Sequence, residues 1–233
     1  MTSSNVPLNL FILGATGGIG RALVEQARQR GHRLTAFVRS PQKLDLCRDG
    51  VTVVRGDPRN AGELRAALPG HDAVLSALGP PGIGPTTVVG DCARSTVAAM
   101  QATGVRRFLV VGVAVLFEND GILGAIARRT FLRNVARDSA EMERIVRGSG
   151  LDWTVARPPR LTNGVLTGAY GVADGQMPPG ARLTISRADV ADFLLDEVEH
   201  PSHVRRIVGL ASVNERSVRE RASTADEEMA VRP

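Results

Sequence analysis

Short apolar runs alternate with amphipathic stretches along most of the chain. Apolar runs bounded by glycine, proline or charged residues predict buried strands. The predicted strands are Leu8–Leu13, Arg33–Arg39, Val51–Arg55, Asp72–Leu78, Arg107–Val113, Trp153–Arg157 and Arg206–Gly209. Between them, apolar residues recur at three- and four-residue spacing, which predicts helices. The predicted helices are Gly18–Arg30, Gly62–Leu68, Pro85–Thr103, Asn134–Gly148 and Ile185–Val198.

This order of strands and helices predicts the architecture of the chain. Regular alternation of strand and helix is typical of βαβ units, so we expect an α/β fold with a doubly wound, mostly parallel sheet of the Rossmann type. The sequence contains neither an internal repeat nor a low-complexity linker, which favours a single domain. We expect residues 1–213 to form this domain, with small substrate-side elements near its end, and the polar residues 214–233 to form a flexible tail.

A cluster of glycines lies between the first predicted strand and the first predicted helix. Its spacing is Gly14-x-x-Gly17-x-x-Gly20, a variant of the dinucleotide-binding pattern. Glycine allows a sharp turn and a close approach of the backbone to a pyrophosphate, and the free N–H groups of the helix then face the anion. The strand and helix on either side favour nucleotide binding over the alternative, a purely structural turn.

The residues after the second strand predict which dinucleotide is bound. An acidic residue there would accept hydrogen bonds from a ribose diol and favour NAD. This chain instead has Arg39, Ser40 and Lys43, which can meet a 2′-phosphate with two cations and a hydroxyl. Lys43 is the only lysine in the sequence. The pattern predicts NADP(H), and the alternative is two unrelated basic residues on the surface.

Two further strand ends complete the predicted cofactor path. Asp57, followed by Pro58, comes after the third strand and can present a carboxylate to an adenine edge, or it can be a solvated turn residue. Leu78 and Gly79 follow the fourth strand and offer backbone close to a ribose and pyrophosphate. Because ligands bind at the carboxyl ends of strands in such sheets, these positions are expected to converge.

Composition narrows the range of partners. Aromatic residues make up 3% of the chain, which argues against base stacking and hence against a nucleic-acid partner. The net charge of +5 comes from scattered arginines, as expected for a surface that tolerates anionic ligands. The two cysteines lack metal-site spacing, and no apolar run approaches the length of a membrane span. We expect a cytoplasmic protein without a metal, either monomeric or a small homo-oligomer, that acts on a small molecule.

Several segments together resemble a known family. GATGGIG, VRSPQKL, GD and SALG are similar to the atypical short-chain dehydrogenase/reductases, in their NAD(P)H-binding, NmrA-like branch. Within that branch, the segments PTTV (85–88) and LTGAY (166–170) and the pair Pro158-Pro159 most resemble the biliverdin IXβ reductase/NADPH flavin reductase type. The resemblance covers residues from about 8 to 200 and implies hydride transfer from NADPH in a permissive pocket.

The resemblance also implies roles for particular residues. Arg39 and Lys43 would hold the 2′-phosphate and Asp57 the adenine, while Leu78 and Gly79 would line the ribose. The residues that would hold the pyrophosphate are Gly14, Thr16, Gly17, Gly18 and Ile19. The residues that would approach the nicotinamide are Pro158 and Pro159.

Two positions depart from that type. Val113 occupies the place of a serine near the nicotinamide, and Arg160 occupies the place of a pocket histidine. The Tyr-x-x-x-Lys pair of ordinary short-chain dehydrogenases is also missing, since Asp174 stands four residues after Tyr170, the only tyrosine. No catalytic residue is therefore assigned. Arg160 can bind an anionic group or be a plain surface arginine, and Tyr170 can form a pocket wall or belong to the core.

The other titratable groups are predicted to be structural. His32 and His71 are expected at the surface. Asp138, Glu141 and Glu143 are expected on a solvated helix face, or one of them can border the pocket. What remains is chemistry that needs little from side chains, since the cofactors carry the difficult step. The sequence favours an NADPH-dependent, flavin-reductase-like oxidoreductase that reduces a flavin, quinone or similar conjugated acceptor. The alternative is a non-catalytic, NADP(H)-binding redox-sensing regulator of the NmrA-like kind, and an isomerase or dehydratase is disfavoured.

Overall fold

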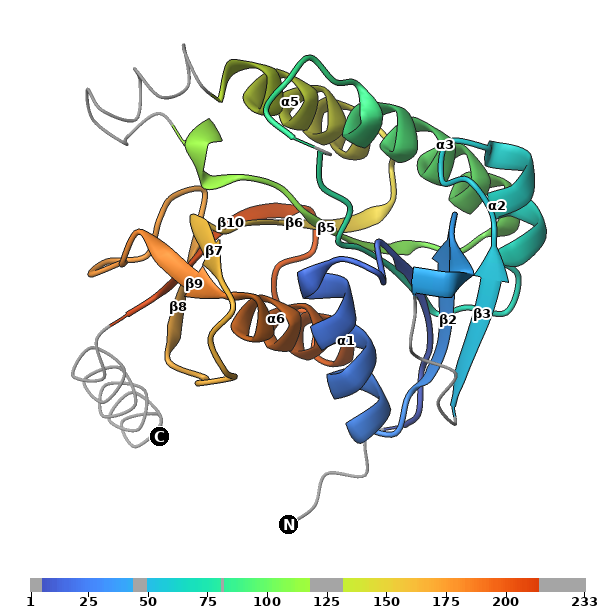
Figure 1. Ribbon diagram of the computed structural model, residues 1–233, viewed down its shortest axis with the longest axis horizontal. Helices are drawn as coiled ribbons and strands as arrows, with labels where there is room; N and C mark the ends of the chain where they lie inside the picture. Colours follow the sequence, from blue (N-terminus) through green and yellow to red (C-terminus); the bar gives the residue numbers. More distant parts are fainter. Residues whose placement is uncertain (1–5, 44–49, 81, 118–131, 214–233) are drawn as a thin grey trace, which may run out of the picture.

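An eight-stranded sheet forms the centre of the computed structural model, which describes residues 6–43, 50–80, 82–117 and 132–213 (Figure 1). Its strand order is β3-β2-β1-β4-β5-β6-β10-β8. The bounds are β1 Asn9–Leu13, β2 Arg33–Val38, β3 Val51–Arg55, β4 Ala73–Ser76, β5 Arg107–Val111, β6 Asp152–Arg157, β8 Tyr170–Asp174 and β10 Arg206–Ser212. All neighbouring strands pair in parallel except β8, which runs antiparallel to β10.

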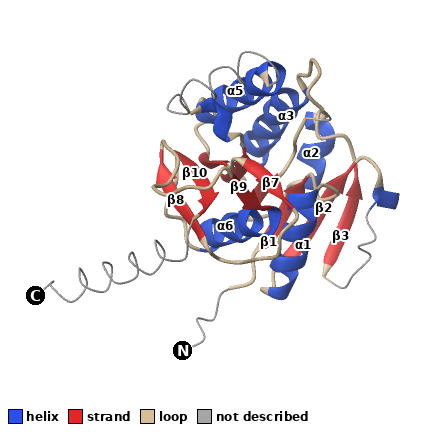
Figure 2. Cartoon of the chain, turned by 60° about the vertical axis from the view of Figure 1, so that its left-hand side comes forward, coloured by secondary structure: helices blue, strands red, loops and turns tan. Residues whose placement is uncertain are grey.

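Helices cover both faces of this sheet, as Figure 2 shows. On one face, α1 (Gly18–Gln29) packs against α6 (Arg187–Glu199). On the other face, α3 (Val88–Thr103) packs between α2 (Ala61–Ala67) and α5 (Arg133–Arg147). The predicted doubly wound α/β domain is confirmed. Among the described residues, no helix is both long and apolar enough to cross a bilayer.

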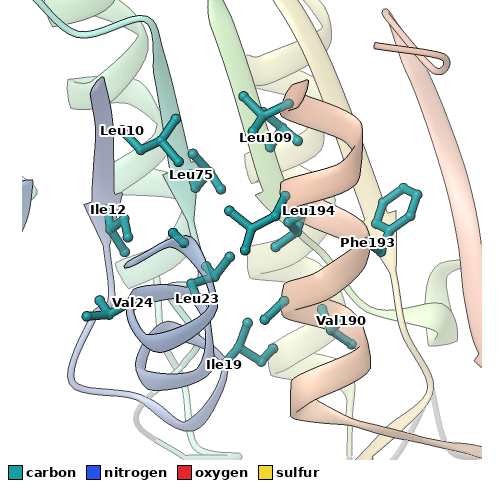
Figure 3. Packing of buried hydrophobic residues seen from close by; sticks show 14 of the residues in the cluster. Leu10, Ile12, Ile19, Leu23, Val24, Leu75, Leu109, Val190, Phe193 and Leu194 are labelled. Carbon is teal, nitrogen blue, oxygen red and sulfur yellow. The ribbon is translucent and has the colours of Figure 1, made fainter. Parts of the chain in front are cut away.

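The sheet carries a separate hydrophobic cluster on each face. On the α1 and α6 side, Ile19 and Leu23 face Val190 and Leu194 across the two helices (Figure 3). Leu10 of β1 lies beneath them and is fully buried. Each fully buried aliphatic side chain contributes about 1.5–3 kcal/mol relative to an exposed one. This packing holds the first turn of α1 in place against the sheet.

Three short strands were not expected from the sequence. A second sheet consists of β7 (Arg160–Thr162) paired in parallel with β9 (Thr184–Ser186), and β8 adds an edge to the main sheet. A three-residue strand is too short to show an alternating pattern, so hydrophobic periodicity could not detect it. The predicted helix over Ile185–Val198 consequently begins later, at Arg187. Two 3₁₀ turns, η1 (Pro41–Lys43) and η2 (Ala114–Leu116), complete the described elements. The predicted tail, 214–233, lies outside the described residues.

The strand order reverses its direction between β1 and β4. From β1 the chain winds outward to β2 and β3, and it then returns to place β4 on the other side of β1. In open α/β sheets, a ligand binds outside the carboxyl ends of the strands at this reversal. Leu13 ends β1 and Ser76 ends β4, and the two residues are paired in register. The glycine turn follows the first of these ends directly.

Candidate functional site

The glycine turn lies against the end of β4. Gly14 has a φ of +82°, which favours glycine, and a Cβ added to it would lie 2.7 Å from the carbonyl oxygen of Ala77. The N–H of Gly17 donates to the carbonyl oxygen of Gly14 at 2.9 Å, which closes the turn. The turn therefore crosses the reversal point of the sheet with no side chain between it and β4.

The turn leads into an open helix N-terminus. Gly17 is the N-cap residue of α1, and Gly17 and Gly18 are both exposed. Within the described part of the chain, no side chain accepts a hydrogen bond from the N–H groups of Gly18 or Ile19, and the first turn of α1 has no acidic residue. The positive end of the helix dipole is thus left for an external anion. Thr16 is half-buried beside it.

Charged residues gather at the ends of β2 and β3. Arg39 is exposed and Ser40 half-buried directly after β2, while the side chain of Lys43 lies outside the described part. Asp57 accepts hydrogen bonds from the backbone N–H of Arg59 at 3.0 Å and from its guanidinium at 2.7 Å. The hydrogen bond from Arg59 holds the pKa of Asp57 below its usual value, and the charge of Arg39 adds to this.

Arg59 was not found by sequence reasoning. Its guanidinium is half exposed, and the hydroxyl of Ser95 on α3 donates to its backbone carbonyl at 2.7 Å. The signal that could have indicated Arg59 is its position two residues after Asp57, the aspartate that follows β3. The carboxylate of Asp57 is engaged by Arg59, so the expected contact between Asp57 and an adenine competes with this ion pair. Pro58 between them is buried.

The ends of β4, β5 and β6 lie side by side. After β4, Leu78 is half-buried and Gly79 is exposed. After β5, the N–H of Ala114 donates to the carbonyl oxygen of Pro158 at 2.9 Å, which joins the loop of Val113 to the Pro158-Pro159 pair. The structure thus brings the loop of Val113 next to Pro158 at this edge of the sheet.

Arg160 begins β7 immediately beyond this pair. Its backbone N–H donates to the carbonyl oxygen of Leu183 at 3.3 Å, while its side chain is exposed. An exposed cation at this end of the sheet is available to an anionic ligand.

Tyr170 is engaged elsewhere. Its hydroxyl donates to Asp192 of α6 at 3.0 Å, and Asp192 pairs with Arg30 at 2.6 Å. Burial, followed by the charge of Asp192, raises the pKa of Tyr170 far above its usual value. Its ring packs with the core between the sheet and α6. The structure does not place its hydroxyl with Val113 and Pro158, and the interpretation of Tyr170 as a core residue describes its surroundings better.

The Tyr170→Phe variant tests this placement. Because the described partner of the phenol is Asp192 within the fold, we expect the free energy of unfolding to fall by about 1 kcal/mol and any turnover by the protein to be unchanged. Denaturant unfolding and steady-state kinetics of the same preparation provide the two measurements. A large loss of kcat in a fully folded variant would show that Tyr170 takes part in the chemistry.

A buried ion pair supports the loops after β5 and β6. The guanidinium of Arg157, the last residue of β6, makes two hydrogen bonds of 2.9 Å and 2.5 Å to the carboxylate of Glu143 on α5. It also stacks 4.6 Å from the ring centre of Phe117. The side chains of Arg157 and Glu143 are only 12% and 5% exposed. A Cβ added to Gly112 would lie 3.0 Å from Glu143. The pair therefore fixes β6 and the loop that begins at Gly112.

The prediction of a solvated acidic face on α5 was wrong for two of its three residues. Glu143 is buried in the ion pair, and buried Asp138 accepts hydrogen bonds from the N–H groups of Val89 and Gly90 at the start of α3. Only Glu141 is solvated, with 38% of its side chain exposed. Each buried carboxylate lies against an element distant in sequence, which supplies the hydrogen bonds that a buried charge needs.

The prediction of surface histidines was also wrong for His32. Its ring is buried, with Nε2 2.7 Å from Glu199 and with Nδ1 accepting from the N–H of Leu8. His71 is half-buried, with Nε2 2.8 Å from the hydroxyl of Thr35. Both rings are engaged at the end of the sheet opposite the glycine turn, so neither is a candidate catalytic residue.

Known proteins are similar to this chain over most of its length. A family model described as NAD(P)H-binding matches residues 14–201. The UPF0659 protein YMR090W of Saccharomyces cerevisiae is 29% identical over 220 residues, which cover 90% of this chain and 95% of that protein. A (4-alkanoyl-5-oxo-2,5-dihydrofuran-3-yl)methyl phosphate reductase of Streptomyces griseus is 29% identical over 163 residues, covering 70% of this chain but only 51% of that protein.

Solved structures share the fold. The Escherichia coli O157:H7 protein ChuY, described as an anaerobillin reductase, superposes with a TM-score of 0.75 at 23% identity, covering 88% of this chain and 97% of ChuY. At this identity the likeness concerns the fold alone. The family match begins at Gly14, so it includes the whole glycine turn together with the ends of β2, β3, β4, β5 and β6. This chain, with its open α1 N-terminus at the reversal of a parallel sheet, belongs to the NAD(P)H-binding family.

Proposed function

We propose that this chain is an NADPH-dependent reductase that transfers hydride to a flavin, quinone or similar conjugated acceptor. The observation that carries the proposal is the combination of an open α1 N-terminus at the sheet reversal with an apolar pair, Val113 and Pro158, at the neighbouring strand ends. The first feature suits a dinucleotide. The second suits a nicotinamide ring that reacts without help from a side-chain acid.

The described residues fit a dinucleotide. Only a glycine at position 14 lets the turn pack against the backbone after β4, because a Cβ there would lie 2.7 Å from the carbonyl oxygen of Ala77. The N–H donors at the start of α1, which no side chain caps, match a pyrophosphate. The residues that would hold the nucleotide are Gly14, Thr16, Gly17, Gly18 and Ile19 at the pyrophosphate, Arg39, Ser40 and Lys43 at the 2′-phosphate, Asp57 and Pro58 at the adenine, Leu78 and Gly79 at the ribose, and Pro158 at the nicotinamide.

The preference for NADPH is tested with Arg39→Ala. Because Arg39 would donate charge-assisted hydrogen bonds only to the 2′-phosphate, we expect NADPH affinity to fall by about 10- to 100-fold and NADH affinity to stay the same. Calorimetric titration with both nucleotides gives the ratio. Equal losses for NADPH and NADH would contradict the assignment of Arg39 to the 2′-phosphate.

The chain's own residues limit the chemistry that it can support. When bound, the nicotinamide supplies the hydride. Val113 and Pro159 would form an apolar wall that excludes water from it, and they hold no proton to donate. Tyr170 already donates to Asp192, and its raised pKa keeps it protonated. An acceptor that takes hydride into an extended conjugated system, with its proton drawn from solvent, suits such a pocket.

Arg160 would orient the acceptor. Its exposed guanidinium, two residues beyond Pro158, can bind a carboxylate or a phosphate in a bidentate manner. The name of the Streptomyces relative describes a reductase whose substrate is a methyl phosphate compound, and such a substrate carries an anionic group. We therefore expect acceptors such as flavin mononucleotide to be reduced faster than their uncharged counterparts.

The experiment is a steady-state assay with purified protein, NADPH and a panel of flavins and quinones. Loss of nicotinamide absorbance with at least one acceptor, and lower activity of Arg160→Gln toward anionic acceptors only, supports the proposal. Tight NADPH binding with no turnover for any acceptor would instead favour the non-catalytic regulator. The observation that favours this alternative is Val113, which stands where the flavin-reductase type has a serine.

A further inference from the structure

The side chain of Arg187, which is distant from the glycine turn in sequence, lies against this turn. A Cβ added to Gly18 would stand 2.3 Å from Cδ and 2.7 Å from Nε of Arg187. Real contacts are never this short, so the space above Gly18 is occupied by the arginine side chain. Gly18 is also one of the two exposed residues where the N–H donors of α1 begin. Arg187 therefore borders the surface that an anion would approach.

The local structure holds Arg187 in this position. Arg187 is the first residue of α6, and the hydroxyl of Ser186 caps this helix by accepting from the N–H of Asp189 at 2.9 Å. The side chain of Gln26 on α1 donates to the carbonyl oxygen of Ala188 at 2.9 Å, which ties the start of α6 to α1. The backbone that carries Arg187 is thus fixed relative to the glycine turn.

Only one described partner binds the guanidinium. Its Nη1 donates to the side-chain oxygen of Asn163 at 2.7 Å, in an exposed pair. Asn163 is neutral, and no described carboxylate forms an ion pair with Arg187. The positive charge is therefore not neutralised within the described residues. The N-terminus of α1, whose first turn has no acidic residue, lies beside this side chain and adds positive potential.

The geometry points to Arg187 as a pyrophosphate-binding residue of the nucleotide site. Its guanidinium supplements the backbone N–H donors of Gly18 and Ile19 with a full positive charge, and Asn163 positions it. This inference rests on the proposed nucleotide site but not on the identity of the acceptor. It assigns the β9–α6 junction, where the second sheet meets α6, to cofactor binding.

Titration of NADP⁺ and NAD⁺ into Arg187→Gln tests the assignment. Both nucleotides carry the pyrophosphate, so we expect both affinities to fall by the same factor, about tenfold, and their ratio to be unchanged. Affinity in the variant should also depend less steeply on salt, because one charge contact is lost. Arg206→Gln is the matched control: it removes the same charge from an exposed arginine at the start of β10, and its affinities should equal those of the wild type.

A double-mutant cycle with Gly18→Ala adds a readout that does not depend on overall folding stability. The new methyl group displaces Arg187, so Gly18→Ala should weaken NADP⁺ binding in the wild type and have much less effect in Arg187→Ala. Equal affinities of wild type and Arg187→Gln, or fully additive effects in the cycle, would overturn the role of Arg187 and leave the proposed reductase standing. Failure of the wild type to bind either nucleotide would overturn both.

Discussion

Replacing Gly20 with alanine is expected to distort the glycine turn and thereby to weaken nucleotide binding. A Cβ at this position would lie 2.0 Å from the carbonyl oxygen of Gly14 and 2.7 Å from Cα of Ala15. Both are backbone atoms, so no side chain can rotate away, and the turn itself must shift. Overpacking of this kind costs about 1–3 kcal/mol of stability. Because the displaced turn no longer presents its N–H groups correctly, we expect NADPH affinity to fall by more than about tenfold.

A matched variant separates this effect from a general effect of removing a glycine. A Cβ added to Gly84 would meet no atom within 4 Å, and its φ is not in the left-handed region. Gly84→Ala should therefore leave both stability and NADPH affinity close to those of the wild type. Thermal unfolding and calorimetric titration of the two variants provide the comparison. Full NADPH affinity in Gly20→Ala would mean that the turn does not hold the pyrophosphate.

Glu143→Ala is expected to give the largest loss of stability. The variant leaves the guanidinium of Arg157 buried without its carboxylate, and removal of one partner from a buried pair costs about 3–5 kcal/mol. Because Arg157 directly precedes Pro158, the loops around the proposed nicotinamide pocket should loosen as well. Urea unfolding measures the first effect, and the KM for the acceptor measures the second.

Glu141→Ala is the control on the same helix. Glu141 makes exposed ion pairs with Arg94 and Arg144, and such pairs are screened by water and salt. We expect its unfolding midpoint to stay near that of the wild type. If Glu143→Ala were no less stable than Glu141→Ala, the buried pair would not be the element that fixes β6 to α5.

The parts of the fold that were predicted correctly are those determined by local pattern. The first strand, the glycine turn and α1 follow one another within residues 9–29, and their apolar periodicity and glycine spacing are visible without any distant contact. The positions of Arg39 and Asp57 at strand ends follow in the same way, because both stand directly after strands that the sequence defines clearly. Strand-end residues converge because parallel strands share one edge.

The parts that were missed depend on contacts between distant segments. Glu143 and Asp138 appear polar and solvated in the helical pattern, yet each is buried by a partner on another element. Arg187 looks like an ordinary first-turn arginine of α6, and only the packing of α6 on α1 brings it to Gly18. The β7–β9 pair was not predicted because a strand of three residues is too short to show an alternating hydrophobic pattern.

The most direct test of the central claim is a single-turnover reaction under anaerobic conditions. The protein is mixed with NADPH carrying deuterium at the transferable C4 position and with the fastest acceptor of the panel, and reduction of the acceptor is followed by absorbance. We predict one rapid phase that is slower with deuterated than with ordinary NADPH, because the bond from C4 to the transferred hydrogen breaks in this step. Bound NADPH that remains reduced in the presence of every acceptor would contradict the account.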